Sequence, residues 1–395
     1  MEKKYIILTG RRNVGKSSLI NRLTGQETAI VSDTAGTTTD PVKKAYEIPG
    51  YAPVVFIDTA GIDDKGNLGE KRTAKTRETI PQADIALLVF TDSRFEEEEK
   101  LLVSLFRKYT IPFLLVHNKS DRTPLSPRLK EELEKEYRTA VIDFSALQQE
   151  QPENIIQAIK ALMPSSQPKT LLEGLVSKND TVLLVTPIDS EAPAGRLILP
   201  QVQTLRALLD HHCIGITVQP EELSGLLQTS SVTPRLVITD SQIFGLVAQI
   251  VPPHIPLTSF SILMARLKGD FQKFMEGTTH IARLKDGDRI LMLESCSHHV
   301  SCEDIGRVKI PALLQKQTGR QLNFDFVAGL GAIQRPITDY ALIIQCGGCM
   351  ITPQQLQNRL RPAIEAGIPV SNYGMALAWL QGIFQRATAL FKQTQ

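Results

Sequence analysis

The chain has few of the features that mark secreted or membrane-spanning proteins. It contains five cysteines among 395 residues, an odd number that argues against a disulfide framework and for metal ligands or free thiols. No apolar run reaches membrane-spanning length, and residues 1–4 carry no signal-peptide pattern. We therefore expect a cytoplasmic protein without membrane contact.

An excess of charge of one sign is also missing. Lys and Arg number 44 against 42 Asp and Glu, so the formal net charge is only +2, and aromatic residues make up 6%. The basic residues are dispersed and form no stripe with aromatic residues, which argues against nucleic acid as a partner. The length is sufficient for two or three domains, each with its own core.

A glycine-rich motif separates an apolar run at 5–8 from a periodic segment at 18–23, and it reads Gly10-Arg11-Arg12-Asn13-Val14-Gly15-Lys16-Ser17. A strand, a loop and a helix in this order form a phosphate-binding loop, or P-loop. Backbone N–H groups would surround the β-phosphate, Lys16 would reach the β- and γ-phosphates, and Ser17 would bind Mg²⁺. The sequence thus predicts a nucleoside triphosphate site with Gly10, Asn13, Gly15, Lys16, Ser17 and Ser18 in contact with the ligand or its cations.

The motif Asn118-Lys119-Ser120-Asp121 follows the apolar run at 111–116 and indicates which base is bound. A carboxylate at Asp121 accepts hydrogen bonds from the N1–H and 2-amino groups of guanine, whereas adenine would leave it unpaired. A second loop with Ser145 and Ala146 follows a strand-like segment and is expected to meet guanine O6 through a backbone N–H. Asn118, Lys119, Asp121, Ser145 and Ala146 therefore predict GTP as the nucleotide.

Two further motifs complete the predicted GTPase site. Asp58-Thr59-Ala60-Gly61 ends an apolar strand, and Asp58 would approach Mg²⁺ while the Gly61 N–H meets the γ-phosphate. Thr38, in the segment Gly36-Thr37-Thr38-Thr39-Asp40, is expected to complete the Mg²⁺ shell when that segment closes over GTP. In this order the motifs resemble the translation-factor-like GTPases, including their tRNA-modifying and ribosome-assembly branches, over residues 1–165.

Two positions bear on how GTP would be hydrolysed. Ile62 stands where Ras-like proteins have an amide that orients the attacking water, so the water must be positioned otherwise. In the related tRNA-modifying GTPases the asparagine at the position of Asn13 holds a K⁺ ion, so the resemblance implies K⁺-stimulated hydrolysis. Glu70 matches a water-positioning carboxylate of those relatives, although its charged surroundings also fit a solvated loop. Lys16, Thr38, Gly61 and Glu70 form the predicted catalytic set.

The predicted fold class is α/β, with a P-loop GTPase domain followed by two further α/β domains with mainly parallel sheets. A proline- and serine-rich linker at 163–168 ends the GTPase domain, which we place at 1–166. Strand-like runs and helical segments alternate through a second domain at 170–266, where we find no chemical constellation and expect a dimerisation module. A third domain is expected at 268–395, with one helix predicted over 374–391.

Cysteines cluster in this third domain. Cys296 follows a predicted strand at 288–293, and Cys346-Gly347-Gly348-Cys349 follows another at 341–344. Open α/β sheets place their sites at the carboxyl ends of strands, so the two groups are expected to converge. A helix predicted to open after Cys349 would favour a thiolate there. Three thiolates suit either Zn²⁺ or an iron-sulfur cluster, and ligand spacing leaves both open; Cys302 is not expected to be a ligand.

The order of GTPase domain, α/β middle and cysteine-bearing domain, with His298-His299 and the segment at 303–311, resembles the [FeFe]-hydrogenase maturation GTPase (HydF) family. The resemblance implies a [4Fe-4S] cluster held by Cys296, Cys346 and Cys349. It also implies a scaffold that receives a diiron precursor of the hydrogenase active site and delivers it to apo-hydrogenase. Many members have histidine before the Cys-x-x-Cys motif, whereas this chain has Gln345, which leaves His298 and Glu294 as candidates for the fourth iron ligand.

Partners and alternatives follow from the same resemblance. It implies radical-SAM hydrogenase maturases and apo-[FeFe]-hydrogenase as partners, a homodimer or higher oligomer, and GTP, Mg²⁺, K⁺ and the cluster as cofactors. GTP would act as a switch that alters partner affinity. The competing hypothesis is a GTPase fused to a zinc- or Fe-S-dependent domain for RNA modification or ribosome assembly.

Overall fold

A computed structural model describes residues 3–25, 41–48, 51, 53–63, 67–147, 152–163, 170–188, 195, 197–229, 233–295 and 304–393. The chain forms two compact units, residues 1–167 and 168–395. The predicted α/β class with mainly parallel sheets is confirmed, because every strand pair among the described residues is parallel except one.

The first unit is built on a six-stranded sheet with the order β2-β3-β1-β4-β5-β6. Its strands are β1 (Lys4–Thr9), β2 (Val42–Glu47), β3 (Pro53–Asp58), β4 (Ile85–Phe90), β5 (Phe113–His117) and β6 (Val141–Asp143). Only the edge strand β2 runs antiparallel to its neighbour. The central strands β4 and β5 are buried along their whole length, which explains their unbroken apolar sequences.

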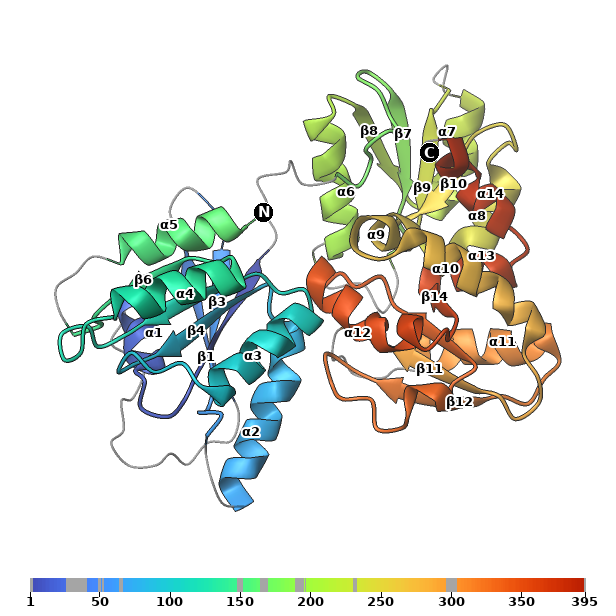
Figure 1. The fold of residues 1–395 in the computed structure, drawn as a ribbon. Helices are drawn as coiled ribbons and strands as arrows, with labels where there is room; N and C mark the ends of the chain where they lie inside the picture. Colours follow the sequence, from blue (N-terminus) through green and yellow to red (C-terminus); the bar gives the residue numbers. More distant parts are fainter. Residues whose placement is uncertain are drawn as a thin grey trace. The chain divides into compact units, whose positions relative to one another are not determined.

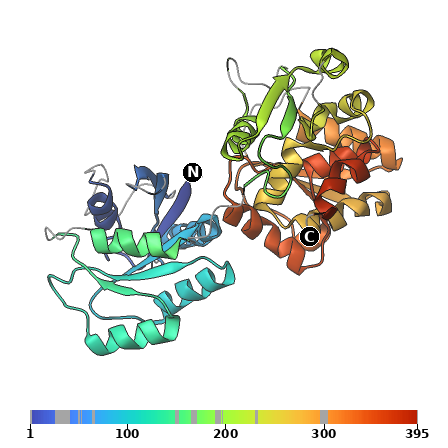
Figure 2. The same ribbon diagram turned by 90° about the horizontal axis from the view of Figure 1, so that it is seen from above.

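Helices cover both faces of this sheet (Figures 1 and 2). They are α1 (Lys16–Thr24), α2 (Asn67–Thr79), α3 (Glu97–Lys108), α4 (Pro127–Tyr137) and α5 (Glu153–Leu162), with a 3₁₀ turn at Ile80–Gln82. Apolar residues of α1 and α5 form one core with one face of the sheet, and those of α3 and α4 form a second core with the other face. This layering places the loops that follow β1, β3, β5 and β6 at the carboxyl edge of the sheet.

The second unit contains two four-stranded parallel sheets. One has the order β10-β9-β7-β8, with β7 (Thr181–Val185), β8 (Ile214–Val218), β9 (Leu236–Thr239) and β10 (Leu257–Ser259). The other has the order β12-β11-β13-β14, with β11 (Arg289–Leu293), β12 (Asn323–Val327), β13 (Leu342–Gln345) and β14 (Val370–Asn372). The small parallel sheet expected in the middle of the chain is therefore present.

Among the described residues of the second unit, the helix expected over 374–391 is replaced by two shorter ones. The helices of this unit are α6 (Leu199–Asp210), α7 (Pro220–Thr229), α8 (Phe244–Ile250), α9 (Phe260–Lys268), α10 (Phe271–Thr278), α11 (Ile310–Thr318), α12 (Pro353–Glu365), α13 (Tyr373–Leu380) and α14 (Phe384–Ala389), with short turns at Ser241–Ile243, Thr279–Arg283, Ile337–Asp339 and Leu390–Gln393. The single helix expected over 374–391 is wrong, because Gly382 takes a left-handed conformation (φ 74°) and separates α13 from α14. A π-helical turn at Ile305–Lys309 precedes α11.

One hydrophobic cluster joins the two sheets of the second unit. It includes Leu183 of β7 and Ile238 of β9 together with Leu291 of β11 and Ile343 of β13, all of them buried. Figure 1 shows α9, α10 and α13 between the two sheets, and α9 contacts both β10 and β14. The two halves of this unit therefore share a core, and each sheet depends on the other for burial.

Candidate functional sites

The P-loop of the first unit can be formed only with glycine at two positions. Gly10 has φ +141°, and a Cβ atom there would lie 2.1 Å from the Val89 carbonyl oxygen. Gly15 has φ +89°, and a Cβ atom would lie 2.4 Å from Nδ2 of Asn118. The loop is thus packed directly against β4 and against the predicted guanine-binding loop, as a phosphate-binding turn requires.

The side chains that were predicted to bind phosphate and Mg²⁺ lie together. The Lys16 ammonium donates to the carbonyl oxygens of Gly10 (3.3 Å) and Arg11 (2.7 Å). The Ser17 hydroxyl donates to Oδ2 of Asp58, while the buried Oδ1 of Asp58 has no hydrogen-bond partner. Burial raises the pKa of Asp58, against the opposing effects of Ser17 and Lys16. A buried carboxylate oxygen with an open lone pair beside a hydroxyl fits a hard cation such as Mg²⁺.

The Asn118-Lys119 pair connects the P-loop to the predicted base-binding loops. Asn118 lies at the end of β5, donates from Nδ2 to the Val14 carbonyl (2.8 Å) and accepts at Oδ1 from the Ala146 N–H (3.1 Å). The Lys119 ammonium donates to the Asn13 carbonyl at 2.5 Å. These bonds position the motif without using Asp121.

Asp121 and Ser145 also meet, although they are 24 residues apart in the sequence. The Ser145 hydroxyl donates to Oδ1 of Asp121 at 2.5 Å, and Ser145 itself is fully buried. The Ser120 N–H donates to the Phe144 carbonyl (3.2 Å), which fixes the two loops relative to each other. The predicted guanine-binding residues therefore form one contiguous group.

The switch residues are described only in part. Gly61 is buried against the P-loop, where a Cβ atom would lie 2.6 Å from the Arg12 nitrogen, and Asp63 accepts from that same N–H at 2.7 Å. Glu70 is exposed in the first turn of α2. Thr38 lies outside the described residues. The segment after β3 is thus fastened to the P-loop next to the predicted γ-phosphate position.

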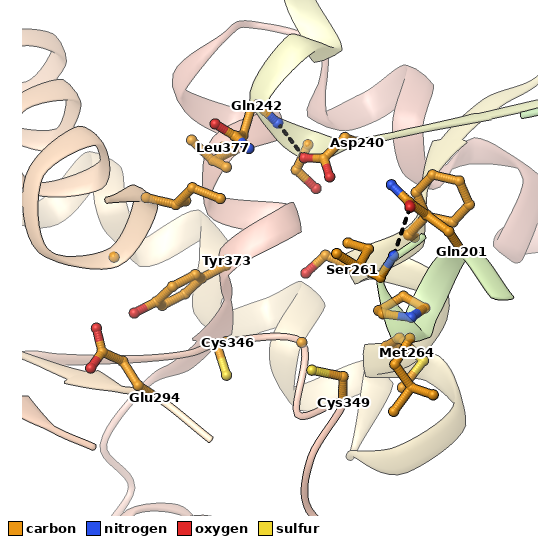
Figure 3. Close-up of a pocket in the computed structure, with 18 of the residues that line it drawn as sticks. Gln201, Asp240, Gln242, Ser261, Met264, Glu294, Cys346, Cys349, Tyr373 and Leu377 are labelled. Carbon is orange, nitrogen blue, oxygen red and sulfur yellow. Dashed lines mark hydrogen bonds between the residues drawn. The ribbon is translucent and has the colours of Figure 1, made fainter. Parts of the chain in front are cut away.

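The second unit contains a cavity of about 780 Å³ between its two sheets. Residues that follow strands line it, among them Asp240 after β9, Glu294 after β11 and Cys346 after β13. Figure 3 shows Cys346 and Cys349 beside each other in its wall, with Asp240 and Gln242 on another side. The carboxyl edges of both parallel sheets therefore open into one space, which is where such sheets bind ligands.

Most of the cavity wall is apolar. Its apolar lining comes from both halves of the unit and consists mainly of Pro187, Leu197, Leu199, Phe260, Met264, Ile305, Met350 and Leu377. Such a wall limits access of water to whatever the cysteines hold. The middle sheet, which the sequence analysis left without chemistry, thus supplies part of a candidate binding site.

The sulfur of Cys346 is surrounded by hydrogen-bonding groups. The Ser295 N–H donates to Sγ at 3.1 Å, and the Ser295 hydroxyl oxygen also lies 3.1 Å from it. Nε2 of Gln345 lies 3.3 Å from the same sulfur. Gln345 is fully buried at the end of β13, so the backbone of one strand fixes both the cysteine and its neighbour.

Cys349 has a different environment, and one expectation about it is wrong. Burial, and then the nearby Cys346, raise the pKa of the Cys349 thiol, and the buried Lys268 only partly opposes this. The helix α12 begins at Pro353 and is capped by the Thr352 side chain, so its amino end is not used to favour a thiolate at Cys349. Desolvation prevails over the helix end.

Two cations frame the cysteine turn, Lys268, which is fully buried, and Arg359, which is half-buried. The Lys268 ammonium, at the end of α9, donates to the carbonyls of Gly348 (3.0 Å), Cys349 (3.5 Å) and Ile351 (2.7 Å). Arg359 of α12 donates to the Glu294 carbonyl at 2.7 Å. Burial lowers the pKa of Arg359 to about 10, a change that the proximity of Cys346 opposes.

Glu294 lies in the cavity wall, but its carboxylate already has a partner. Arg307 donates to both carboxylate oxygens, with distances of 3.1, 3.1 and 2.8 Å, and Glu294 is only 3% exposed. The Arg307 guanidinium in turn has a raised pKa because of its hydrogen bonds to Glu294. A metal at Glu294 would have to compete with this ion pair.

The predicted iron-sulfur ligands are thus described in part. Cys346 and Cys349 are free thiols in one cavity, while Cys296 and His298 lie outside the described residues, as does Cys302. Within the described ranges, no group of three or more His, Cys, Asp or Glu side chains could hold a metal ion. Two soft sulfur donors, one of them already accepting N–H bonds, fit a cluster or a soft metal by the chemistry of the donor set.

Sequence reasoning missed Lys268, Arg307 and Arg359. Lys268 is the last residue of an amphipathic helix, where a basic residue normally interacts with the helix end in solvent. Arg359 lies in the middle of a polar helix with no local sign of burial. Only the convergence of distant segments shows that Lys268 and Arg359 lie beside the cysteine turn and that Arg307 pairs with Glu294; no pattern along the chain signals it.

Comparisons with known proteins agree with the first site. Residues 5–119 match the family model of the 50S ribosome-binding GTPases. The tRNA modification GTPase MnmE of Nitrosomonas europaea is 45% identical over 130 residues, which cover 32% of this chain and 28% of that protein. GTPase Der of Wolinella succinogenes is 42% identical over 135 residues, 33% of this chain and 28% of that protein. The chain therefore spans about 28% of the length of these relatives.

Solved structures give weaker likenesses. Era of Aquifex aeolicus has a TM-score of 0.38 and 20% identity, covering 55% of this chain and 93% of that chain. The G domain of the T. maritima FeoB iron transporter has a TM-score of 0.33 and 23% identity, covering 41% of this chain and all of that one. The sequence comparisons and the P-loop, metal and base-binding geometry define the class: the first unit is a P-loop GTPase domain.

The rest of the chain identifies the family. Residues 171–269 match the model of the hydrogen maturase F dimerization domain, and residues 272–390 match that of the hydrogen maturase F tetramerization domain. Together these matches cover more than half of the chain. The chain belongs to the hydrogen maturase F (HydF) family. In the part of the chain that the structure describes, no helix is long and apolar enough to cross a membrane.

Proposed function

We propose that this protein is a cytoplasmic, GTP-hydrolysing scaffold. It binds a [4Fe-4S] cluster and a diiron precursor of the [FeFe]-hydrogenase active site, and it transfers that precursor to the apo-hydrogenase. The observation that carries the proposal is the cavity in which Cys346 and Cys349 lie together between two sheets. The family match and the GTPase domain support the same function.

Three thiolates, those of Cys296, Cys346 and Cys349, are proposed to anchor the cluster. A cubane held by three protein sulfurs keeps one iron whose ligand can be exchanged, and this is the chemistry that the bound cluster would supply. His298 and Glu294 are the candidates for that position. Because the Glu294 carboxylate is engaged by Arg307, we expect it to be a weak and displaceable ligand.

The cavity is proposed to be the chamber for the diiron cargo. Its volume of about 780 Å³ is open space beside the two cysteine side chains, and its lining is mainly apolar. An apolar wall excludes water from labile metal ligands, while the adjacent cluster would hold one end of the cargo. The chain would receive this cargo from radical-SAM maturases and act as a homodimer or higher oligomer, as the names of the matched domains suggest.

GTP is proposed to act as a switch. Lys16, Ser17 and Asp58 would hold GTP and Mg²⁺, Gly61 and Thr38 would respond to the γ-phosphate, and Glu70 would position water. The Arg12 N–H of the P-loop donates to Asp63 in the segment after β3. This bond would form or break when that segment moves between the GTP and GDP states. Affinity for the maturases should then differ between the GTP and GDP forms; equal affinity and kinetics would contradict this role.

The cluster is tested by anaerobic reconstitution with iron and sulfide, followed by EPR spectroscopy of the reduced protein. Cys349→Ala should lose the [4Fe-4S] signal. Cys213→Ala should keep it, because Cys213 is a buried cysteine of the same unit that lies outside the cavity lining. Colourless wild-type protein with stoichiometric zinc would overturn the scaffold proposal and favour the zinc-dependent GTPase.

Potassium dependence is tested by measuring GTP turnover in K⁺ and in Na⁺ at equal ionic strength. The Asn13 backbone has φ 57° and its carbonyl accepts from Lys119, so its position in the P-loop is fixed. We expect faster hydrolysis in K⁺ and loss of that difference in Asn13→Ala. Equal rates in the two salts for wild-type protein would remove the K⁺ site from the mechanism.

A further inference from the structure

Gln345 faces away from the cavity, behind the cysteine that it precedes. It is the last residue of β13, it is fully buried, and it is not among the residues that line the cavity. Its amide nitrogen, which carries two hydrogens, donates one to the Ser295 hydroxyl oxygen at 2.9 Å; the other is shared between the Cys346 carbonyl oxygen at 3.2 Å and Cys346 Sγ. This side chain therefore cannot serve as an iron ligand in the conformation described.

The same amide nitrogen reaches the sulfur of Cys346. Nε2 of Gln345 lies 3.3 Å from Sγ, where the Ser295 N–H also donates at 3.1 Å. In the metal-free protein the Cys346 thiol donates to the Ser295 hydroxyl oxygen at 3.1 Å, and Gln345 donates to the same oxygen. Once Cys346 is a thiolate it has no hydrogen to donate, so the Ser295 hydroxyl can turn its own hydrogen toward the sulfur. A thiolate at Cys346 would thus be surrounded by three donors, two from Ser295 just after β11 and one from Gln345 at the end of β13.

The carbonyl oxygen of the Gln345 amide destabilises the fold. This oxygen, Oε1, is buried and has no hydrogen-bond partner. An unpaired buried carbonyl destabilises a protein, so an apolar side chain of similar shape would suit the packing better. The hydrogen bonds donated by the amide nitrogen are therefore the contribution that glutamine makes at this position.

We propose that Gln345 is a positioning residue that sets the reduction potential of the cluster through Cys346. It does so by donating to Sγ and by orienting the Ser295 hydroxyl toward the same atom. Hydrogen bonds to a ligand sulfur stabilise the more negative, reduced state of a cluster and raise its potential. This inference rests on the proposed function, because it requires that Cys346 holds the cluster.

The test is a redox titration of the reconstituted full-length protein followed by EPR. Gln345→Met keeps the shape and removes the donor, and its midpoint potential should be more negative than that of wild type. Gln345→Glu places an acceptor at the same point and should shift it further in the same direction. Gln317→Met, the same exchange at an exposed position of α11, should leave the potential unchanged.

If Gln345 had only a structural role, its substitution would change the stability of the protein and not the reduction potential of the cluster. We expect metal-free Gln345→Met to melt close to the wild-type temperature, because the exchange removes an unpaired buried carbonyl together with the bonds that the amide nitrogen donates. A stable variant with full cluster content and an unchanged potential would overturn the inference. A wild-type protein that assembles no cluster would instead refute the proposed function, so the two failures are distinguishable.

Ser295→Ala provides an independent check. It removes the hydroxyl but keeps the backbone N–H that donates to Cys346. Its potential should fall, and adding Gln345→Met should lower it by less than the sum of the two single changes, because both act on the same sulfur. Full additivity would contradict the relay through the Ser295 hydroxyl.

Discussion

Lys268 holds the cysteine turn in place from inside the second unit. Its ammonium is 1% exposed and donates to three carbonyls of residues 348–351. We expect Lys268→Met to lower the free energy of unfolding by about 2–4 kcal/mol, because these carbonyls lose their donor in a buried site. Urea unfolding measures this loss, and iron content after reconstitution should fall in parallel. Lys316→Met, at an exposed position of α11, should change neither quantity.

The raised pKa of Cys349 gives the metal-free protein a pH dependence. Burial favours the neutral thiol, so its contribution to stability is fully present below the ordinary pKa of 9.0 and is lost as the pH rises through the higher folded value. The pH profile of Cys349 alkylation should therefore have a higher midpoint in native than in urea-unfolded protein. Mass spectrometry of the modified peptide reports it; identical midpoints would contradict the desolvated site.

At the scale of elements, helix α3 supports the P-loop through an ion pair. Glu99 in its first turn is 1% exposed, and Arg11 of the P-loop donates to both its oxygens at 2.8 and 2.9 Å. Glu99→Gln should lower the stability of the GTPase unit by about 1–3 kcal/mol, because Arg11 loses its buried charged partner. Urea unfolding tests this, and Glu97→Gln, whose side chain is 87% exposed on the same helix, should stay within about 0.5 kcal/mol of wild type.

Elements also show where prediction from sequence reached its limit. The alternation of apolar strands with amphipathic segments correctly indicated two further parallel sheets. The π-helical turn before α11 and the break at Gly382 were missed, because helical periodicity continues across both. No single segment encodes that the carboxyl edges of the two sheets in the second unit face each other. The contribution of Leu199 and Phe260 to the cysteine cavity could therefore not be predicted from the sequence.

For the whole molecule, the two compact units predict two separate unfolding transitions. Each has its own core, so residues 1–167 and 168–395 should each fold when expressed alone. Residues 168–269 alone should aggregate, since Leu183 and Ile343 belong to one cluster that spans both sheets. Calorimetry tests this. GTP at a hundred times its dissociation constant should raise the free energy of unfolding of the first unit by about 2.7 kcal/mol and leave that of the second unit unchanged. A cooperative melt of residues 168–269 would contradict the shared core.

The sequence by itself determined the GTPase class of the first unit, the two parallel sheets that follow, and the position of the Cys-x-x-Cys motif at the end of a strand. Those features depend on short motifs whose backbone geometry is local, such as the P-loop with its required glycines and the strands that end at Asp58 and Gln345. Only the tertiary structure decided the surroundings of the cysteines. The raised pKa of Cys349 follows from burial, which is a property of the packed whole. The Ser295 N–H that donates to Cys346 is 51 residues away, and Arg307, the partner of Glu294, comes from another segment than β11.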